Sequence, residues 1–289
     1  MMKTILVPLR GSPGDTAALE TAYLAAQMFQ SHLECLYVRP DPRELMLRTA
    51  GVGMGTPVIT PELWTALDEE EQSRRTLARK AFDDFRTLRK IAHVDVPAKL
   101  QAVSAVWREV TGDTARRIVH MAHAMELVVL GRDAGIDSVL DQIGDVLVEC
   151  GRPVILSSGT PPATLATTIA IAWKETPEAA RAMTAAMPFL ARAKKVVVIS
   201  SDEGNNGAAT TESAARLARA LQWNGIEAQL MRLQDAPDIP GQILNGAVEV
   251  GADLLVMGAY SHSRAREFIL GGMTRRVLVE ATLPVLFCH

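Results

Sequence analysis

The sequence predicts an α/β protein built from two tandem repeats, each a five-stranded, parallel, open sheet flanked by helices. Short continuous apolar runs, which suit strands covered on both faces, alternate with amphipathic helical patterns, an arrangement typical of βαβ units. The order strand, turn, helix, strand that begins at residue 4 starts again at residue 168. This internal repetition predicts two units of the same fold.

The composition fits an ordinary globular protein of about two domains. The chain has 289 residues, of which 48% are hydrophobic and 22% charged, so a disordered or collagen-like chain is excluded. The net charge is −3, and basic residues are scattered among acidic ones. We therefore expect no nucleic-acid partner, because general nucleic-acid binders carry a basic excess or a basic stripe.

Cys35, Cys150 and Cys288 lie far apart in the sequence, so we expect free thiols in a reducing compartment rather than disulfides. The first residues lack the apolar core of a signal peptide, and no apolar run of membrane-spanning length occurs. These features predict a soluble, cytoplasmic protein with no membrane partner.

The first half of the first repeat is predicted in order along the chain. A strand at residues 4–9 leads through a turn rich in Gly and Pro into an alanine-rich helix at 16–30, and a second strand follows at 32–38. Residues 39–61, rich in Pro and Gly, are expected to form an inserted loop. Residues 62–91 then have the spacing of an amphipathic helix.

The acidic run at residues 68–71 lies on this helix. We interpret it as a solvated helix face paired with Arg74 and Arg75 rather than as a metal cluster. The repeat continues with a helix at 113–124 and a strand at 126–131.

The second repeat follows the same order. Its predicted elements are a strand at 168–173, a helix at 179–193, a strand at 195–200, and later strands at 253–258 and 283–287. The later strands repeat the apolar runs that close the first repeat, which indicates that both units end in the same way.

The boundary between the repeats is predicted at residues 157–167, a segment rich in Ser, Thr, Pro and Gly. We therefore expect one repeat at residues 1–158 and the other at 166–289. The last strands of the two repeats, at 154–156 and 285–287, are apolar and are candidate edge strands.

One segment of the second repeat carries the strongest chemical signal. Residues 258–274 read Gly-x2-Ser-x9-Gly-Gly-x-Thr, directly after a predicted strand and before a helical stretch. A glycine at the end of a parallel strand lets a ligand or another backbone approach closely. Gly271 and Gly272 free backbone N–H groups at the positive end of a helix dipole, and the Thr274 hydroxyl adds a donor. The segment thus predicts an anion cradle suited to phosphate.

This segment resembles the motif Gly-x2-Gly-x9-Gly-(Ser/Thr) of the universal stress protein family, and the resemblance extends over both repeats. It implies an adenine nucleotide alpha hydrolase-like fold. In single-domain members the last strands pair across a dimer, so the resemblance also implies that the last strands of the two repeats pair inside this chain, which forms an intramolecular pseudo-dimer. Many members bind ATP or AMP between the first and fourth strands. The resemblance therefore implies a stress-response protein that binds ATP or AMP, with or without Mg²⁺, as a regulatory or signalling module. The residues that it assigns to the nucleotide are Ala172, Trp173, Lys174, Met257, Gly258, Ser261, Gly271, Gly272, Met273 and Thr274.

Several positions depart from the family pattern. Ser261 replaces the second glycine and Gly272 replaces the usual Ser or Thr, although Thr274 keeps a hydroxyl nearby. Nucleotide-binding members usually place an Asp at the end of the first strand, where this chain has Arg10 and Lys174. We therefore expect the acidic contact to the nucleoside to be missing from both repeats. Lys174 either faces a phosphate or lies in solvent.

The first repeat is degenerate at this motif. The segment after Gly131 is shorter and more acidic, with Asp133, Asp137, Asp141 and Asp145 at every fourth position. These acids would repel a phosphate, and we interpret them as a solvated helix edge rather than a cation site. The first repeat is thus expected to be a partner domain, with the nucleotide held by the second.

Other chemical signals are weaker. His120 and His123 lie on a predicted helix without further ligands at a recognised spacing, so no metal site is predicted. Trp173 is either a core residue or a platform for the adenine ring. No P-loop and no nucleophile elbow occur. No residue is placed as a general base either, so enzymatic activity stays open, with slow ATP hydrolysis as its upper limit.

A second function also stays open. With Arg10 and Lys174 in place of acids, the pocket would be vestigial, and the protein would act as a scaffold that binds a protein partner without nucleotide. A homodimer in addition to the pairing of the two repeats is a further alternative.

Overall fold

The computed structural model describes residues 2–41, 60–97, 101–133, 140–201, 207–233, 238–259 and 272–289. In the first repeat the elements are β1 (Thr4–Leu9), α1 (Gly14–Phe29), β2 (His32–Pro40), α3 (Pro61–Arg89), β3 (Ala92–His93), β4 (Ser104–Gly112), α4 (Thr114–Ala122), β5 (Leu127–Leu130), α5 (Leu140–Glu149) and β6 (Val154–Leu156). In the second they are β7 (Thr168–Ala172), α6 (Pro177–Leu190), β8 (Lys195–Ser201), α7 (Gly207–Gln222), β9 (Ala228–Leu233), α8 (Ile239–Glu249), β10 (Leu254–Gly258), α9 (Gly272–Glu280) and β11 (Val285–Cys288).

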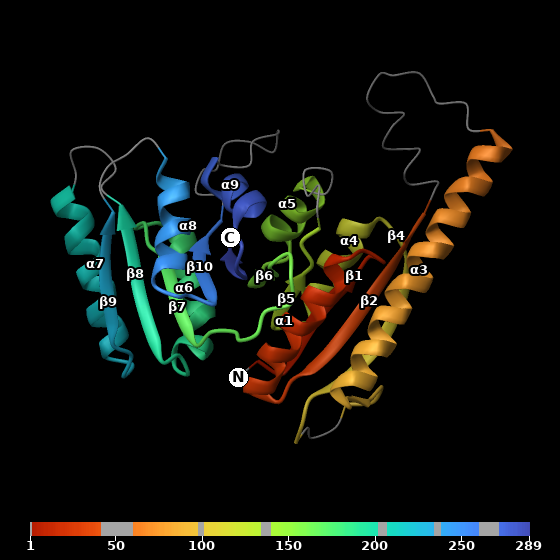
Figure 1. Ribbon diagram of the computed structural model, residues 1–289, viewed down its shortest axis with the longest axis horizontal. Helices are drawn as coiled ribbons and strands as arrows, with labels where there is room; N and C mark the ends of the chain where they lie inside the picture. The colour runs from red at the N-terminus through yellow and green to blue at the C-terminus, as the bar shows by residue number, and fades with distance from the viewer. Residues whose placement is uncertain are drawn as a thin grey trace.

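All these strands join one continuous, open sheet (Figure 1). Its order is β3-β4-β2-β1-β5-β6-β11-β10-β7-β8-β9, so each repeat contributes one half. The strands within each half are parallel, which confirms the α/β fold predicted from the alternating apolar runs. Each half also places its first strand beside its fourth long strand, β1 beside β5 and β7 beside β10.

The two halves meet through the last strand of each repeat. β6 and β11 pair antiparallel, with Leu286 opposite Ile155 and Phe287 opposite Val154. All four of these side chains are fully buried or nearly so. The expected pairing inside the chain is therefore confirmed, and the two repeats form an intramolecular pseudo-dimer.

The strand count differs between the repeats. The second has the five strands expected, whereas the described part of the first has a sixth, the two-residue β3 at its outer edge. β3 pairs only with Ser104 and Ala105, the first residues of β4. It forms because the chain that leaves the long helix α3 must pass along the edge of β4 before entering it.

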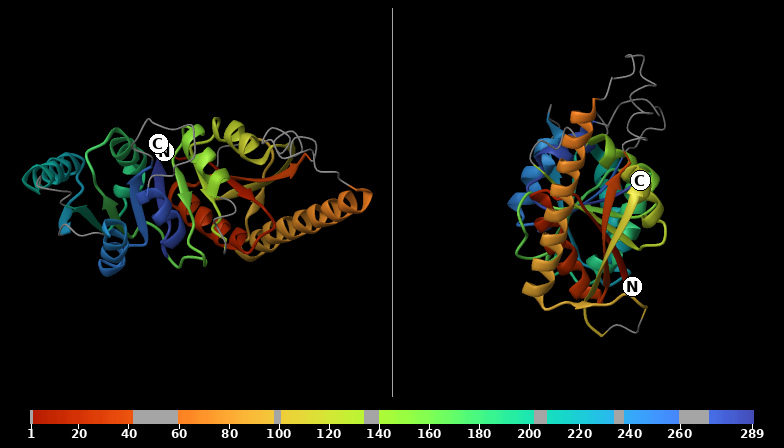
Figure 2. Two further views of the ribbon diagram at one scale, coloured as in Figure 1. Left: turned by 90° about the horizontal axis from the view of Figure 1, so that it is seen from above. Right: turned by 90° about the vertical axis from the view of Figure 1, so that its right-hand side faces the viewer.

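Helices cover both sides of the sheet (Figure 2). One buried cluster joins α1 and α3 to α6 and α7, and the other joins α4 and α5 to α8 and α9. Both clusters contain residues of both repeats, so the core continues across the seam. On the first face, the rings of Phe29 and Phe189 meet edge to face with centroids 5.2 Å apart.

The helix predicted at 62–91 is confirmed as α3, but its expected ion pairs are only half correct. Arg74 pairs with Glu70 one turn earlier. Arg75 instead reaches Glu109 on β4, with N–O distances of 2.8 and 2.9 Å. The side chain of Glu71 lies near Arg39 of β2, at 3.5 Å. Tertiary packing of α3 on the sheet thus redirects charges that the sequence assigned within the helix. Of the loop predicted at 39–61, residues 42–59 lie outside the described residues.

Candidate functional site

The candidate site of the second repeat lies where β7 and β10 end side by side. β7 continues into α6 on one face of the sheet, and β10 precedes α9 on the other. Adjacent strands whose helices leave in opposite directions create a crevice at the carboxyl edge of an open α/β sheet, the usual ligand position in such folds. Gly258, the first residue of the sequence motif, therefore lies at the topological switch point.

Gly258 makes room for the protein's own backbone. A Cβ at this position would lie 2.6 Å from the amide nitrogen of Ala179 and 2.8 Å from the carbonyl carbon of Glu178. Gly131 plays the same part in the first repeat, where a Cβ would lie 2.9 Å from the carbonyl oxygen of Gly14. Of the two uses expected for the strand-end glycine, close approach of a ligand or of backbone, the described contacts show the second.

Glu178, in the first turn of α6, places a carboxylate beside Gly258. Its side chain is 13% exposed, and one oxygen accepts a hydrogen bond from Arg181 at 2.9 Å. The other oxygen, Oε2, is buried and has no partner within the described part of the chain. Glu178 was not predicted from the sequence, because the acid was expected at the strand end, where Lys174 stands. The only signal was an acid directly after Pro177, at the start of a helix.

The predicted contacts divide between the two faces of the sheet. Met257 lies opposite Ala172 in the register of β10 and β7, and both pack with Met273 in the cluster under α8 and α9. Trp173 packs instead on the α6–α7 face, where its indole N–H donates to Ser213 Oγ at 3.0 Å. This contact favours the core interpretation of Trp173 over the adenine platform.

The predicted phosphate turn is described only in part. Gly272 is the first residue of α9, and a Cβ placed on it would meet no atom within 4 Å. Thr274 follows in the first turn and is 4% exposed. Lys174 lies exposed after the end of β7. Ser261 and Gly271 lie outside the described residues.

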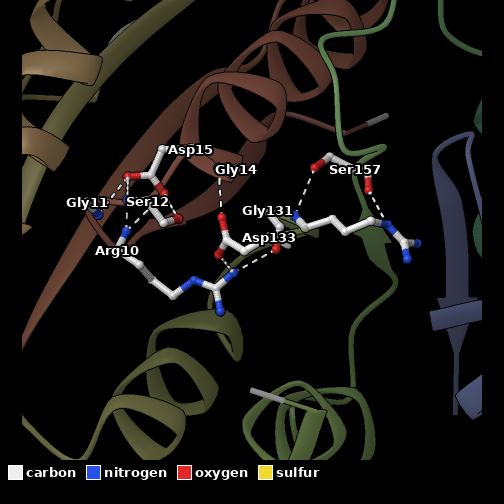
Figure 3. Close-up of polar contacts among 9 residues, drawn as sticks. Arg10, Gly11, Ser12, Gly14, Asp15, Gly131, Asp133 and Ser157 are labelled. Atoms are coloured by element: carbon white, nitrogen blue, oxygen red, sulfur yellow. Dashed lines mark hydrogen bonds and ion pairs between the residues drawn. The ribbon is translucent and has the colours of Figure 1, made fainter. Parts of the chain in front are cut away.

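The matching position in the first repeat is filled by side chains of the repeat itself (Figure 3). Arg10 Nη2 donates to the carbonyl of Gly131 at 2.7 Å and to Asp133 at 2.8 Å. The other oxygen of Asp133 accepts from the amide of Gly14, at the start of α1, at 2.8 Å. One carboxylate therefore joins the ends of β1 and β5 to the helix that begins there.

This arrangement corrects the interpretation of the acidic segment after Gly131. Asp133 is not on a solvated helix edge, because its side chain is 17% exposed and paired with Arg10. Asp145, on α5, is exposed as expected. Asp137 lies outside the described residues, as does the side chain of Asp141. Asp133 thus helps to fill the switch point of the first repeat.

A second carboxylate occupies the loop after β1. Asp15 is 1% exposed and accepts hydrogen bonds from the amides of Arg10, Gly11 and Ser12 at 3.0, 2.8 and 3.4 Å (Figure 3). Burial raises the pKa of Asp15 above its ordinary value, although these bonds act in the opposite direction. Successive amides that converge on an anion form a nest, and here the nest already holds a carboxylate from the same chain.

Little space remains at this point of the first repeat. A cavity of about 20 Å³, lined by Pro8, Arg10, Leu130 and Gly131 among others, has room for roughly one water molecule. On the other side of the loop, a Cβ on Gly11 would lie 2.1 Å from the carbonyl oxygen of Arg74 on α3. Among the described residues, the space found beside the ends of β1 and β5 is therefore far smaller than a nucleotide.

Comparison with known proteins decides the family. The model of the universal stress protein family matches residues 1–150 and 166–289. The chain belongs to the universal stress protein family. No curated protein matches the sequence. Both repeats carry the family match, so this universal stress protein has the tandem arrangement.

Solved structures agree with the fold over almost the whole chain. A universal stress protein from Archaeoglobus fulgidus DSM 4304 has 15% identity, covers 99% of this chain and 97% of its own, and has a TM-score of 0.70. A protein of unknown function from Pseudomonas aeruginosa PAO1 has 18% identity, coverages of 99% and 92%, and a TM-score of 0.60. At these identities the likeness concerns the fold alone.

The histidines of this universal stress protein that the sequence singled out are His120, on α4, and His123, directly after it. His120 and His123 lie with ring centroids 6.4 Å apart, and His123 Nε2 lies 3.3 Å from the carbonyl oxygen of Glu149. Among the residues described, no three His, Cys, Asp or Glu side chains come together to hold a metal ion. None of the helices described is both long and apolar enough to span a membrane.

Proposed function

We propose that the second repeat of this universal stress protein binds an adenine nucleotide, ATP or AMP, and that the chain acts as a nucleotide-dependent regulatory module in a stress response. The first repeat, residues 1–158, would serve as its partner domain, and residues 166–289 would hold the ligand. Family membership supports this ligand class, since a universal stress protein is known in complex with cAMP.

The observation that carries the proposal is the unpartnered oxygen of Glu178. A buried carboxylate oxygen without a donor is costly, so its presence at the switch point favours a ligand that brings one. A ribose hydroxyl is a donor of the right kind. Glu178 would then supply, from the start of α6, the acidic contact that Lys174 does not provide at the end of β7.

The amino end of α9 supports the phosphate part of the proposal. Gly272 leaves the space around the first helical residue free of side chain, and N–H groups at the start of a helix favour an anion. Lys174, the second residue after the end of β7, adds a positive charge on the neighbouring strand. The two features together suit a negatively charged ligand. Mg²⁺ would be held mainly by the phosphates, as is usual for this cation.

A cytoplasmic location also belongs to the proposal. Cys35 and Cys150 are buried free thiols and Cys288 is a half-buried one. Three unpaired cysteines suit a reducing compartment.

Calorimetric titration tests the proposal. The unsubstituted protein is titrated with ATP and with AMP, each with and without Mg²⁺, and one site per chain is expected. Gly272→Glu should abolish binding, because a carboxylate would occupy the phosphate position. An acid in the first turn suits the helix dipole, so the loss would not reflect unfolding of α9.

Glu178→Gln should weaken binding about tenfold, because it removes a charged acceptor for a ligand hydroxyl. Glu62→Gln is the matched control, since Glu62 is an exposed first-turn acid of α3 in the other repeat. Full affinity in both Gly272→Glu and Glu178→Gln would contradict the assignment of the site.

The scaffold function is the second candidate. Its support is that Arg10 is engaged inside the first repeat and that Trp223, at the end of α7, is 92% exposed. If the purified protein releases no nucleotide on denaturation and gives no heat with ATP or AMP, the scaffold function replaces nucleotide binding.

A further inference from the structure

An arginine of the first repeat crosses the seam and contacts a helix of the second. Arg132 is the second residue after the end of β5 and is 7% exposed. Its Nη1 donates to the carbonyl of Leu278, and its Nε donates to the carbonyl of Ser157 at 3.3 Å. Leu278 lies in the last turn of α9, whose final carbonyls have no partner within the helix. Arg132 therefore caps the carboxyl end of α9.

The topology of the seam explains why this arginine can reach α9. β5 and β6 are parallel, and β6 is antiparallel to β11. The end of β5 thus lies near the beginning of β11, which is where the chain leaves α9. A long side chain on the second residue after β5 spans this short separation.

Within the described parts of the chain, the charge of Arg132 faces a helix end rather than an acid. The acceptors of its side-chain hydrogen bonds are carbonyl oxygens, and Nη2 is buried without a partner among the described residues. Burial lowers the pKa of Arg132 to about 10. A buried cation of this kind is stabilised by the partial negative charge at the carboxyl end of a helix.

The contact runs in one direction only. Arg132 follows Gly131 in the first repeat, and the matching residue after Gly258 in the second repeat is Ala259. Alanine has no polar side chain, so it cannot make the reciprocal contact. The first repeat, whose own switch point is filled, thus provides a charged side chain to the second. The helix that receives it is the one whose amino end carries Gly272.

We propose that Arg132 is a positioning residue that holds α9 in place, so that the first repeat sets the nucleotide affinity of the second. The link to affinity rests on the proposed function. α9 has nine residues and a length of about 14 Å, and an isolated helix this short is unstable in water. Its amino end therefore depends on anchors such as the contact at its carboxyl end.

Two measurements on Arg132→Gln and Arg132→Lys test this. Without nucleotide, hydrogen exchange of the α9 amides should be about tenfold faster in Arg132→Gln, while exchange in α6 and α8 is unchanged. AMP affinity should fall about tenfold, within the usual range of coupling between sites. Arg132→Lys, which keeps a charged donor, should restore part of both effects.

Arg152→Gln is the matched control. Arg152 also donates to a carbonyl after the end of a helix, that of His123, but this contact lies within the first repeat. It should leave the exchange of α9 and the AMP affinity unchanged.

Equal acceleration of exchange over α6, α8 and α9 would mean that Arg132 only stabilises the whole chain, and would overturn the proposal. Unchanged AMP affinity in Arg132→Gln would overturn the link between the repeats. If the unsubstituted protein binds no nucleotide, the proposed function and that link fail together. Faster exchange confined to α9 would in that case still support the anchor.

Discussion

Carboxylates lie at the switch points of both repeats, but they come from different elements and have different partners. In the first repeat Asp133 is paired with Arg10, and Asp15 is surrounded by three backbone amides. In the second repeat Glu178 has Arg181 on one oxygen and no described partner on the other. The difference lies in the hydrogen-bond donors rather than in the acids. The first repeat provides donors for both of its carboxylates, whereas the described part of the second provides none for Oε2 of Glu178.

Asp15 gives the stability a defined dependence on pH. Because its pKa in the folded chain is raised above the ordinary value of 3.8, the folded chain holds this proton more tightly than the unfolded chain. The stabilisation is complete below the ordinary value and is lost as the pH rises through the folded pKa. The free energy of unfolding of the unsubstituted protein, minus that of Asp15→Asn, should therefore fall as the pH rises above the ordinary pKa of 3.8.

Urea unfolding at several pH values measures this difference. Asp238→Asn, at the exposed amino cap of α8, is the control for an Asp to Asn exchange that removes no buried charge. A difference for Asp15→Asn that rises with pH would show that the hydrogen bonds from the nest outweigh burial.

At the scale of elements, close packing of a helix start on a strand end organises both repeats. α1 begins against Gly131 of the first repeat, and α6 begins against Gly258 of the second. In each case the atoms that a Cβ would meet include backbone atoms of the helix start, which cannot move aside as a flexible side chain can. The glycine thus fixes where the helix begins relative to the sheet.

Gly258→Ala should lower the free energy of unfolding by about 2 kcal/mol, because the added methyl group would overlap the backbone of Glu178 and Ala179. Urea unfolding is the measurement. Gly272→Ala is the control, since a Cβ there meets nothing within 4 Å, and its effect should stay within about 0.5 kcal/mol. Equal effects of the two substitutions would contradict the packing role of Gly258.

At the scale of the whole molecule, the two repeats share one sheet and the buried clusters on both of its faces. β6 and β11 join the sheet, and Phe29 of α1 meets Phe189 of α6 on one face. The guanidinium of Arg192 lies 4.7 Å from the centre of the Phe29 ring. We therefore expect the chain to unfold in a single cooperative transition despite its two repeats.

Phe189→Ala should lower the free energy of unfolding by about 3–5 kcal/mol and split the transition in two, because it removes a fully buried ring at the seam. Differential scanning calorimetry measures both effects. Phe82→Ala is the control, since Phe82 is also fully buried but lies on α3, away from the seam. If both substitutions leave a single transition, the Phe29–Phe189 contact does not couple the repeats.

The sequence predicted the elements whose signals are local. The apolar runs at 4–9 and 168–173 became β1 and β7, and the helical spacing at 62–91 became α3. No range was predicted for β4 or β9, which lie near the edges of the sheet. Their mixed patterns, Ser104–Gly112 and Ala228–Leu233, have exposed and half-buried positions, whereas β1, β5 and β6 are buried almost throughout.

The chemistry of the sites was predicted less completely. The places of Gly258 at a strand end and of Gly272 at a helix start were predicted, because these features follow from spacing along the chain. Glu178 and Asp133 were missed or misplaced, because each acts on a group that is distant in sequence. The arginines expected next to acids on α3 were half correct for the same reason, as Arg75 pairs with Glu109 on β4.

The sequence by itself determined the repetition and the α/β fold, because periodicity and apolar runs record which faces are buried. The pairing of the last strands was predicted from the family resemblance that the sequence motif carries. Only the tertiary structure decided that the first repeat fills its own switch point with Arg10 and Asp133 and that Arg132 caps a helix of the second. The physical reason is that hydrogen bonds and ion pairs depend on which atoms come within about 3 Å. In this protein those atoms belong to residues more than one hundred positions apart.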